Sequence, residues 1–338
     1  MKNLLVFLFA LALSVGYAQD AQEIPGLFDS EEVLELTIRA DFASFLADRT
    51  GTAKAVKAQI TYSTLDGSSV DVPLKIKVRG RFRRDPMVCD FPPIRLDFDK
   101  DDDLPPPFQN QNKLKVVTHC QYEEYIFREY YLYKVFQLLS EYSFKVRLCR
   151  ISYVDINKAR ETETKWAFLI EAEDELAERF GGEPLDEDVN VTPDDVERDQ
   201  LTLVHMFNYM AANRDFDVRI RQNVKVISRA EGRPVVVPYD FDWSGMVNAE
   251  YTKSYTQAGG PVYKDRVRFV RLCRTEEEYN AILDQFRAIK GEVFELYQSS
   301  PYLSKEVIKE SLGYYKTFYK TSKKGKTMEE VFLKGCSQ

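Results

Sequence analysis

Apolar and polar residues alternate along much of the first third of the chain, in the manner of half-buried β-strands. The alternating segments are 34–40, 58–62, 72–78, 94–98 and 113–117. Asp66-Gly67 is a turn signal between two of them. Because successive side chains on a strand point to opposite faces, this pattern predicts a β-meander with one buried face.

The period changes after residue 122, where apolar side chains recur three and four positions apart. This spacing predicts a helix that ends near Leu139. The segments 146–154 and 166–170 then predict two strands of a hairpin. The polar segment 181–195 contains Gly and Pro, and we place a boundary between two halves of the chain there.

The second half has mainly helical patterns. The run Thr192–Asp195 is typical of a helix start, and Thr275 followed by Glu278 predicts another. The other predicted elements are helices near 304–319 and 327–335 and a short hairpin of 223–227 with 235–237. The pattern therefore predicts an α+β chain, with a β-rich N-terminal lobe over 19–180 and a mainly helical C-terminal lobe over 181–338.

Residues 1–18 have the features of a secretory signal peptide. Lys2 precedes an apolar run from Leu4 to Leu13, and small residues at Gly16 and Ala18 form a cleavage site. The run is too short to span a bilayer, and no later stretch has the roughly 20 apolar residues that a span needs. We therefore expect export to the periplasm or the cell exterior, without a transmembrane segment.

The composition narrows the function classes. Hydrophobic residues make up 44% of the 338, enough for packed cores, and the net charge of −7 disfavours nucleic acid as a partner. With only two histidines, the chain cannot form a metal site with several histidine ligands. Its five cysteines include no CxxC motif of the kind that binds zinc or carries out redox chemistry. Cys89 and Cys120 are the pair that we favour for a disulfide.

The strongest chemical signal lies in the segment 211–245. Its acidic and amide residues are Asn213, Asp215, Asp217, Asn223, Asp240 and Asp242. Carboxylates beyond a strand end suit Mg²⁺, and a loop Asp ahead of an Asn suits phosphoryl transfer. The residues around Asp215, or those around Asp240, could by themselves simply cap turns. Because a short predicted hairpin joins the two sets, we favour a functional site. Asp240-x-Asp242 also allows a nucleotide-sugar site or a phosphatase nucleophile, although Pro238-Tyr239 separates it from the strand.

A basic strand end offers groups for phosphate. If the strand over 72–78 continues, Arg79, Arg81 and Arg83 share one face, and Gly80 allows a ligand to approach the backbone. A solvated or salt-bridged strand end explains the same residues. Lys113 and Lys115 share one face of a predicted strand, and Glu171 follows the strand 166–170. A buried pair of one such lysine with Glu171 would resemble the Lys–Glu pair that orients nucleotide phosphates in kinases. Lysines and glutamates are also common on protein surfaces, which explains the same residues.

In their order along the chain, these blocks resemble the CotH-like family of atypical kinases, and an exported bacterial branch of it. The blocks are KVRGRFRR, FREYYLYKVFQLL, RLCRISYVD, AFLIEAEDELAERFG, MAANRDFD and VPYDFDWSG. They cover roughly residues 70 to 250. The resemblance implies a bilobal protein-kinase-like fold and transfer of the γ-phosphoryl group of ATP to protein Ser or Thr hydroxyls, with Mg²⁺.

Matched by motif, the resemblance implies a role for each site residue. It makes Asp215 the catalytic base, Asn223 and Asp240 metal ligands, and Asp242 a second candidate ligand. It matches Arg79 and Gly80 to the family's Arg-Gly strand and Glu171 to an acidic residue after the middle hairpin.

Two positions depart from the family pattern. Asp217 is the alternative base, because eight residues separate Asp215 from Asn223 and only six separate Asp217 from it. We favour Asp215 because Asn213 precedes it. The family's basic pair falls here on Phe91-Pro92, so Lys115 or Arg81 takes its place in contacting the nucleotide.

Two functions remain open from the sequence. The first is an exported Mg²⁺-dependent phosphotransferase that takes ATP and a protein acceptor. The second is a catalytically inactive kinase-like fold that acts as a periplasmic or cell-surface binding module. Little ATP is present outside a bacterial cell, so activity there needs imported nucleotide or another phosphoryl donor.

Overall fold

The computed structural model describes residues 26–64, 67–99, 103–257, 272–323 and 329–333. The predicted signal peptide, 1–18, lies outside these residues. None of the described helices is both long and apolar enough to cross a membrane.

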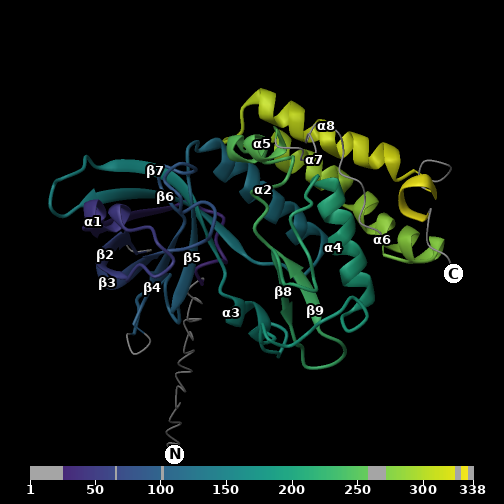
Figure 1. The fold of residues 1–338 in the computed structure, drawn as a ribbon, viewed down its shortest axis with the longest axis horizontal. Coiled ribbons are helices and arrows are strands. Elements are labelled where there is room, and N and C mark those ends of the chain that lie inside the picture. Colours follow the sequence, from purple (N-terminus) through teal and green to yellow (C-terminus); the bar gives the residue numbers. More distant parts are fainter. Residues whose placement is uncertain (1–25, 65–66, 100–102, 258–271, 324–328, 334–338) are drawn as a thin grey trace, which may run out of the picture.

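The N-terminal strands close into a seven-stranded barrel, on the left in Figure 1. Its strands are β1 (Leu34–Ala40), β2 (Val56–Ser63), β3 (Ser69–Val78), β4 (Ile94–Asp97), β5 (Lys113–Thr118), β6 (Val146–Asp155) and β7 (Glu163–Ile170). Their order around the barrel is β1-β2-β3-β4-β5-β7-β6. The barrel closes through β1 and β6, which pair in parallel with Leu34 opposite Cys149. Alternate apolar side chains of the strands fill its interior.

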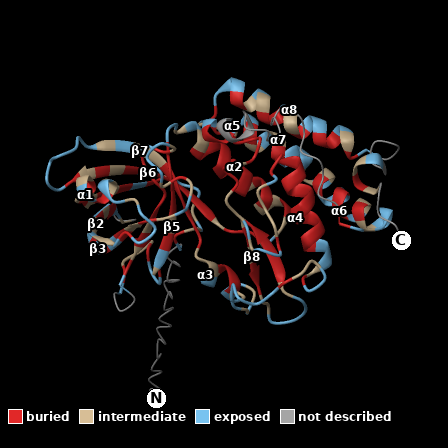
Figure 2. Cartoon of the chain, viewed as in Figure 1, coloured by how far each residue is buried: buried red, intermediate tan, exposed pale blue. Residues whose placement is uncertain are grey.

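Helices and a two-stranded ribbon make up the rest. The helices are α1 (Phe42–Ala47), α2 (Glu124–Leu139), α3 (Glu173–Glu178), α4 (Arg198–Met210), α5 (Glu250–Gln257), α6 (Glu276–Ala288), α7 (Lys290–Gln298), α8 (Lys305–Thr321) and a π-helical turn at Glu329–Leu333. The ribbon pairs β8 (Val224–Ile227) with β9 (Val235–Pro238). Helices α2 and α4 are buried along most of their length, whereas α8 is exposed on its outer side (Figure 2).

The expected bilobal protein-kinase-like fold is wrong. The predicted meander strands exist, but β1–β7 form a closed barrel rather than the sheet of a kinase N-terminal lobe. The predicted boundary at 181–195 stays a prediction, and the structure has two apolar clusters, one of which fills the barrel. The other cluster runs from barrel residues such as Leu148 and Phe168 through α2 and α4 to Phe318 in α8. The kinase-like fold was expected wrongly because the barrel closes through the pairing of β1 with β6. These strands are far apart in the sequence, and local periodicity does not encode their contact.

Local capping signals were partly right. Thr275 and Glu278 form the predicted capping box at the start of α6. The helix expected to start at Thr192 begins only at Arg198, where the Glu197 side chain caps it. The Thr192 hydroxyl and amide instead bond the Asp195 carboxylate within a local turn. A hydroxyl three residues before a carboxylate therefore fits a turn as well as a helix start.

The cysteines have distinct roles. Cys89 and Cys120 form the predicted disulfide, which fastens the segment after β3 to the end of β5. Cys149 is a buried free thiol on β6. Cys273 is also disulfide-bonded.

His119 makes folding sensitive to acid. Its ring packs against Phe91, and its Nδ1 has no hydrogen-bond partner among the described residues. Burial lowers the pKa of His119 to about 4. Because the unfolded state binds the extra proton between that value and the ordinary pKa of about 6.5, stability falls as the pH drops through this window. We expect His119 to contribute a loss of about 2 kcal/mol of unfolding free energy between pH 7.5 and pH 5.

Urea unfolding of the protein and of His119→Phe at the two pH values measures this term. Glu129 and Glu175 contribute with the opposite sign, because burial raises their pKa values to about 8 and about 7. The relevant quantity is therefore the difference between the two proteins. An equal pH dependence in both would contradict the assignment to His119.

Candidate functional site

The β8–β9 ribbon brings the two acidic segments of the predicted site together. Asp215 lies in the loop between α4 and β8, and Asp240 follows β9. Val224 pairs with Pro238, and the Tyr239 amide donates to the Asn223 carbonyl at 3.1 Å. Asn223, the last residue of the Asp215 loop, therefore lies beside Tyr239 and Asp240. The predicted hairpin of 223–227 with 235–237 is confirmed.

Asp215 is held in place by amide side chains. Asn223 Nδ2 donates to the Asp215 carbonyl and to Asp215 Oδ2, both at 2.7 Å. Gln222 Nε2 donates to Oδ1 of the same carboxylate. From the other side, Asn213 Oδ1 accepts the Asp215 amide at 3.0 Å, and Asn213 is itself bonded to Asn208 at 2.8 Å. The carboxylate is thus fixed relative to both α4 and β8.

Asp217, the alternative base, has a different environment. Its Oδ1 accepts the Arg219 amide at 2.8 Å, and its backbone pairs with that of Gln222. These contacts close the tight turn that ends at Asn223. The geometry therefore joins Asp215, and not Asp217, to the Asn223 side chain.

Left-handed backbone occurs at the site. Asn223 has φ 49° and Asp240 has φ 60°, while Ala212 at the end of α4 has φ 54°. Asn and Asp tolerate this region best among residues with a Cβ, but Ala does not. Such conformations cluster at sites where side-chain placement matters.

Asp240 is the electrostatic centre of the site. Burial and the negative charge of Asp240 raise the pKa of Asp215. The charge of Asp240 also opposes ionisation of Asp242, whose pKa is raised first by burial. These carboxylates are therefore close enough to sense one another, and a cation between them would relieve the repulsion.

Lys115 and Arg79 bring positive charge to the same place. Burial and the neighbouring charges of Arg79 and Lys225 lower the pKa of Lys115 to about 8, although Glu173 and then Asp240 partly oppose this. Lys115 Nζ lies 4.9 Å from the centre of the Tyr239 ring, next to Asp240. Lys115, on β5, therefore lies beside the segment after β9, and the charge of Arg79, just after β3, acts on it.

The segment after β3 departs from the predicted geometry. Strand β3 ends at Val78, although the Arg79 amide still bonds the Pro93 carbonyl at 2.9 Å. Gly80 has φ 80° with open space where a side chain would be, and Arg81 is exposed. Arg83 points into the protein and is buried. The expected common face of Arg79, Arg81 and Arg83 is wrong, because a turn at Gly80 ends the strand alternation.

Glu171 is engaged elsewhere. Arg179 binds both of its oxygens at 2.9 Å, and the Lys145 amide donates to Oε2 at 3.0 Å. This bidentate pair anchors α3 to the end of β7. The structure does not join Glu171 to Lys115, and Lys113 is exposed.

Sequence reasoning missed the groups behind Asp240. Glu129 and Tyr133 project from α2, and Tyr251 from α5. Tyr133 Oη accepts the Asp240 amide at 2.8 Å, and Tyr251 Oη donates to Asp242 Oδ2 at 2.9 Å. The available signal was a carboxylate, Glu129, within the aromatic run of a helix that is buried nearly all round.

The metal-binding capacity of the site is modest. Within the described ranges, no three His, Cys, Asp or Glu side chains form a group that could hold a metal ion. Mg²⁺ commonly uses only one or two carboxylates, with water and substrate phosphates as the remaining ligands. Asn223 and Asp240 suit that mode of binding but do not form an all-protein cage.

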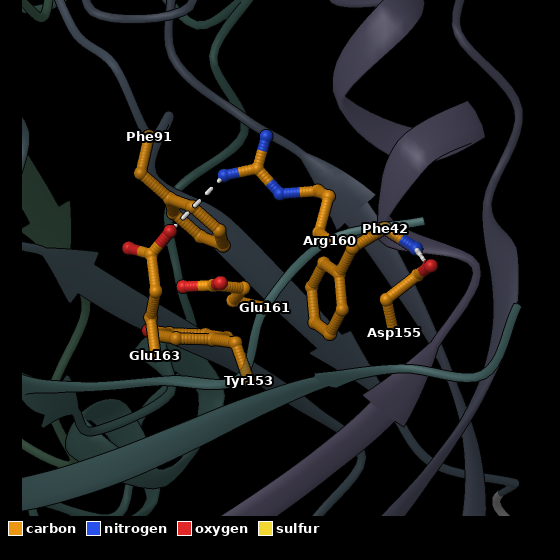
Figure 3. A pocket seen from close by; sticks show the side chains of 7 residues that line it. All are labelled: Phe42, Phe91, Tyr153, Asp155, Arg160, Glu161 and Glu163. Atoms are coloured by element: carbon orange, nitrogen blue, oxygen red, sulfur yellow. Dashed lines mark hydrogen bonds and ion pairs between the residues drawn. The ribbon is translucent and has the colours of Figure 1, made fainter. Parts of the chain in front are cut away.

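Two hollows on the molecule lie away from these residues. Figure 3 shows a small one, of about 10 Å³, lined by Phe42, Phe91, Tyr153, Asp155, Arg160, Glu161 and Glu163. This is room for about one water molecule. A wider groove of about 410 Å³ lies at the N-terminal end of α4, where Glu197 and Leu203 line it, whereas Asp215 follows the opposite end of α4. The candidate site therefore rests on its chemistry and not on the size of a cavity.

Comparisons with protein-family models, curated proteins and solved structures found no significant match to this chain.

Proposed function

We propose that this chain is an exported Mg²⁺-dependent phosphotransferase that uses the site around Asp215 and Asp240. One observation carries the proposal. The Asp215 carboxylate is hydrogen bonded to Asn223, the charge of Asp240 acts on Asp215 and on Lys115, and the charge of Arg79 acts on Lys115. Acidic groups for a divalent cation and basic groups for phosphate are the two requirements of phosphoryl transfer.

Each residue has a role in this proposal. Asp215 accepts the proton of the attacking hydroxyl, a role that its raised pKa favours. Asn223 and Asp240 hold Mg²⁺, which neutralises phosphate charge when bound. Lys115 and Arg79 bind phosphate oxygens, and the open space at Gly80, the residue after Arg79, leaves room for a ligand.

The donor and the acceptor are inferred from the resemblance to CotH-like kinases. That resemblance suggests ATP as the donor and a protein Ser or Thr hydroxyl as the acceptor. The proposal does not depend on a kinase fold. It depends on the residues of the site, because similar chemistry recurs on unrelated folds.

A transfer assay tests this function. Purified protein is incubated with γ-³²P-ATP and Mg²⁺, alone and with a Ser/Thr-rich acceptor protein, and label on protein is counted. We expect Mg²⁺-dependent labelling that excess EDTA removes and that added Mg²⁺ restores. Binding of Mg²⁺-ATP without labelling would favour the binding-module function. An absence of both binding and labelling would refute the proposal.

A further inference from the structure

A buried network of the Arg83 guanidinium and the carboxyl groups of Glu129 and Asp242 lies directly behind Asp240. Arg83 Nη1 lies 3.6 Å from Glu129 Oε2 and 3.6 Å from Asp242 Oδ2. Arg83 Nη2 also donates to the Thr118 carbonyl at 3.0 Å. Only 8% of Arg83, 2% of Glu129 and 4% of Asp242 is exposed to solvent. The network therefore connects the segment after β3, helix α2 and the segment after β9 inside the protein.

This network is poorly explained as a device for stability. Burying a charged group such as the Arg83 guanidinium costs several kcal/mol, and apolar side chains of similar volume often serve stability as well or better. Arg83 Nε and Glu129 Oε1 have no hydrogen-bond partner among the described residues. A buried network with unsatisfied atoms suggests a role in placing neighbouring groups.

The groups that it places are those of the Asp240 turn. Tyr133 lies four residues after Glu129 on α2, so both side chains project from the same face of the helix. Tyr133 Oη accepts the Asp240 amide at 2.8 Å, while Arg83 and Tyr251 both hold Asp242 Oδ2. These contacts fix both ends of a turn in which Asp240 has the left-handed φ of 60°.

We propose that Arg83 and Glu129 are positioning residues, which hold Asp240 in the orientation that the site requires through the Asp242 carboxylate and the face of α2. This inference rests on the proposed function. Arg83 is too deeply buried to bind a phosphate itself, although it belongs to the same basic run as Arg79. In this arrangement Asp242 is an anchor for Asp240 and not a second metal ligand.

Arg83→Met and Arg83→Lys test the inference. Methionine keeps the apolar stem and removes the charge, whereas lysine keeps the charge without the fork. For Arg83→Met we expect kcat to fall at least tenfold while the KM for ATP, measured at saturating Mg²⁺, stays within twofold, because Arg79 and Lys115 are unchanged. We also expect a higher Mg²⁺ concentration for half-maximal rate. Arg83→Lys should restore part of the rate, an outcome that lost packing alone would not produce.

Two further variants guard against misfolding and non-specific effects. Tyr133→Phe removes only the acceptor for the Asp240 amide, and it should reduce kcat in the same direction. Arg147→Met is the matched control. Arg147, on β6, is as buried as Arg83, with 8% of it exposed. It donates hydrogen bonds to the carbonyls of Leu27 and Glu32. We expect its kcat to equal that of the unaltered protein.

Hydrogen exchange of the Asp240 amide gives a readout that does not need activity. In Arg83→Met we expect its protection to fall at least tenfold, with protection in α4 unchanged. If the unaltered protein transfers phosphate but Arg83→Met keeps its kcat and amide protection, the positioning role is refuted and the proposed function stands. If the unaltered protein neither binds nor transfers, the proposed function falls, and unchanged protection in Arg83→Met would refute the positioning of Asp240 as well.

Discussion

Asp215→Asn is expected to reduce the rate of phosphoryl transfer by roughly 10²–10⁴-fold, because a positioned general base contributes about that much. Asp240→Asn is expected to reduce it by roughly 10²–10³-fold, the usual cost of removing one preorganised electrostatic group. The two losses should differ in kind. Asp215→Asn should leave Mg²⁺-ATP binding intact, whereas Asp240→Asn should weaken it. Initial rates of label transfer and calorimetric titration with Mg²⁺-ATP measure both effects.

Asp217→Asn is the matched control for this pair. Asp217 belongs to the same loop but closes a turn through the Arg219 amide. An asparagine oxygen can accept the same bond, so the rate should change less than about threefold. A loss in Asp217→Asn as large as that in Asp215→Asn would make Asp217 the base and contradict the assignment from the Asn223 hydrogen bonds.

Replacing Cys89 and Cys120 by serine is expected to lower the free energy of unfolding by about 3–4 kcal/mol. The disulfide closes a loop with a sequence separation of 31, and closing a loop of this size in the unfolded chain has about that entropic effect. Both cysteines are also almost fully buried, so the serine hydroxyls enter an apolar site. Urea unfolding followed by tyrosine and tryptophan fluorescence measures the change.

Substitution is preferable to a reducing agent in this experiment, because Cys273 is disulfide-bonded as well. Cys149→Ala is the control, since it removes a buried thiol that has no covalent partner. We expect it to lower the unfolding free energy by about 1 kcal/mol. A double serine variant no less stable than Cys149→Ala would contradict a stabilising role for the disulfide.

The sequence predicted the local elements better than the architecture. Alternation identified the barrel strands, and helical spacing identified α2, because both periods arise within a short segment. Barrel closure depends on the pairing of Leu34 with Cys149, and no local signal specifies a partner so far away. The family resemblance led to a wrong fold, because it implied a kinase-like sheet whereas the strands form a closed barrel.

The candidate site was predicted unevenly for a similar reason. The Asp215, Asn223 and Asp240 cluster was accessible because a short ribbon with recognisable turn residues joins its parts. Lys115 was identified from its type and place on a strand, and its proximity to the segment after β9 depends on the tertiary contact of its ammonium group with the Tyr239 ring. The contact between Glu129 and Arg83 was not predicted. Glu129 lies in an aromatic helical run, and the basic run that contains Arg83 fits the continuation of a solvated strand.

The parallel contact between β1 and β6 has a consequence for synthesis and for engineering. Strand β1 cannot form its full pairing with β6 until the ribosome has synthesised residue 155. Until then, the backbone N–H and C=O groups on that edge of β1 have no strand partner. Fragments that stop before β6 should therefore aggregate, while those that reach the end of β7 should not do so through this edge.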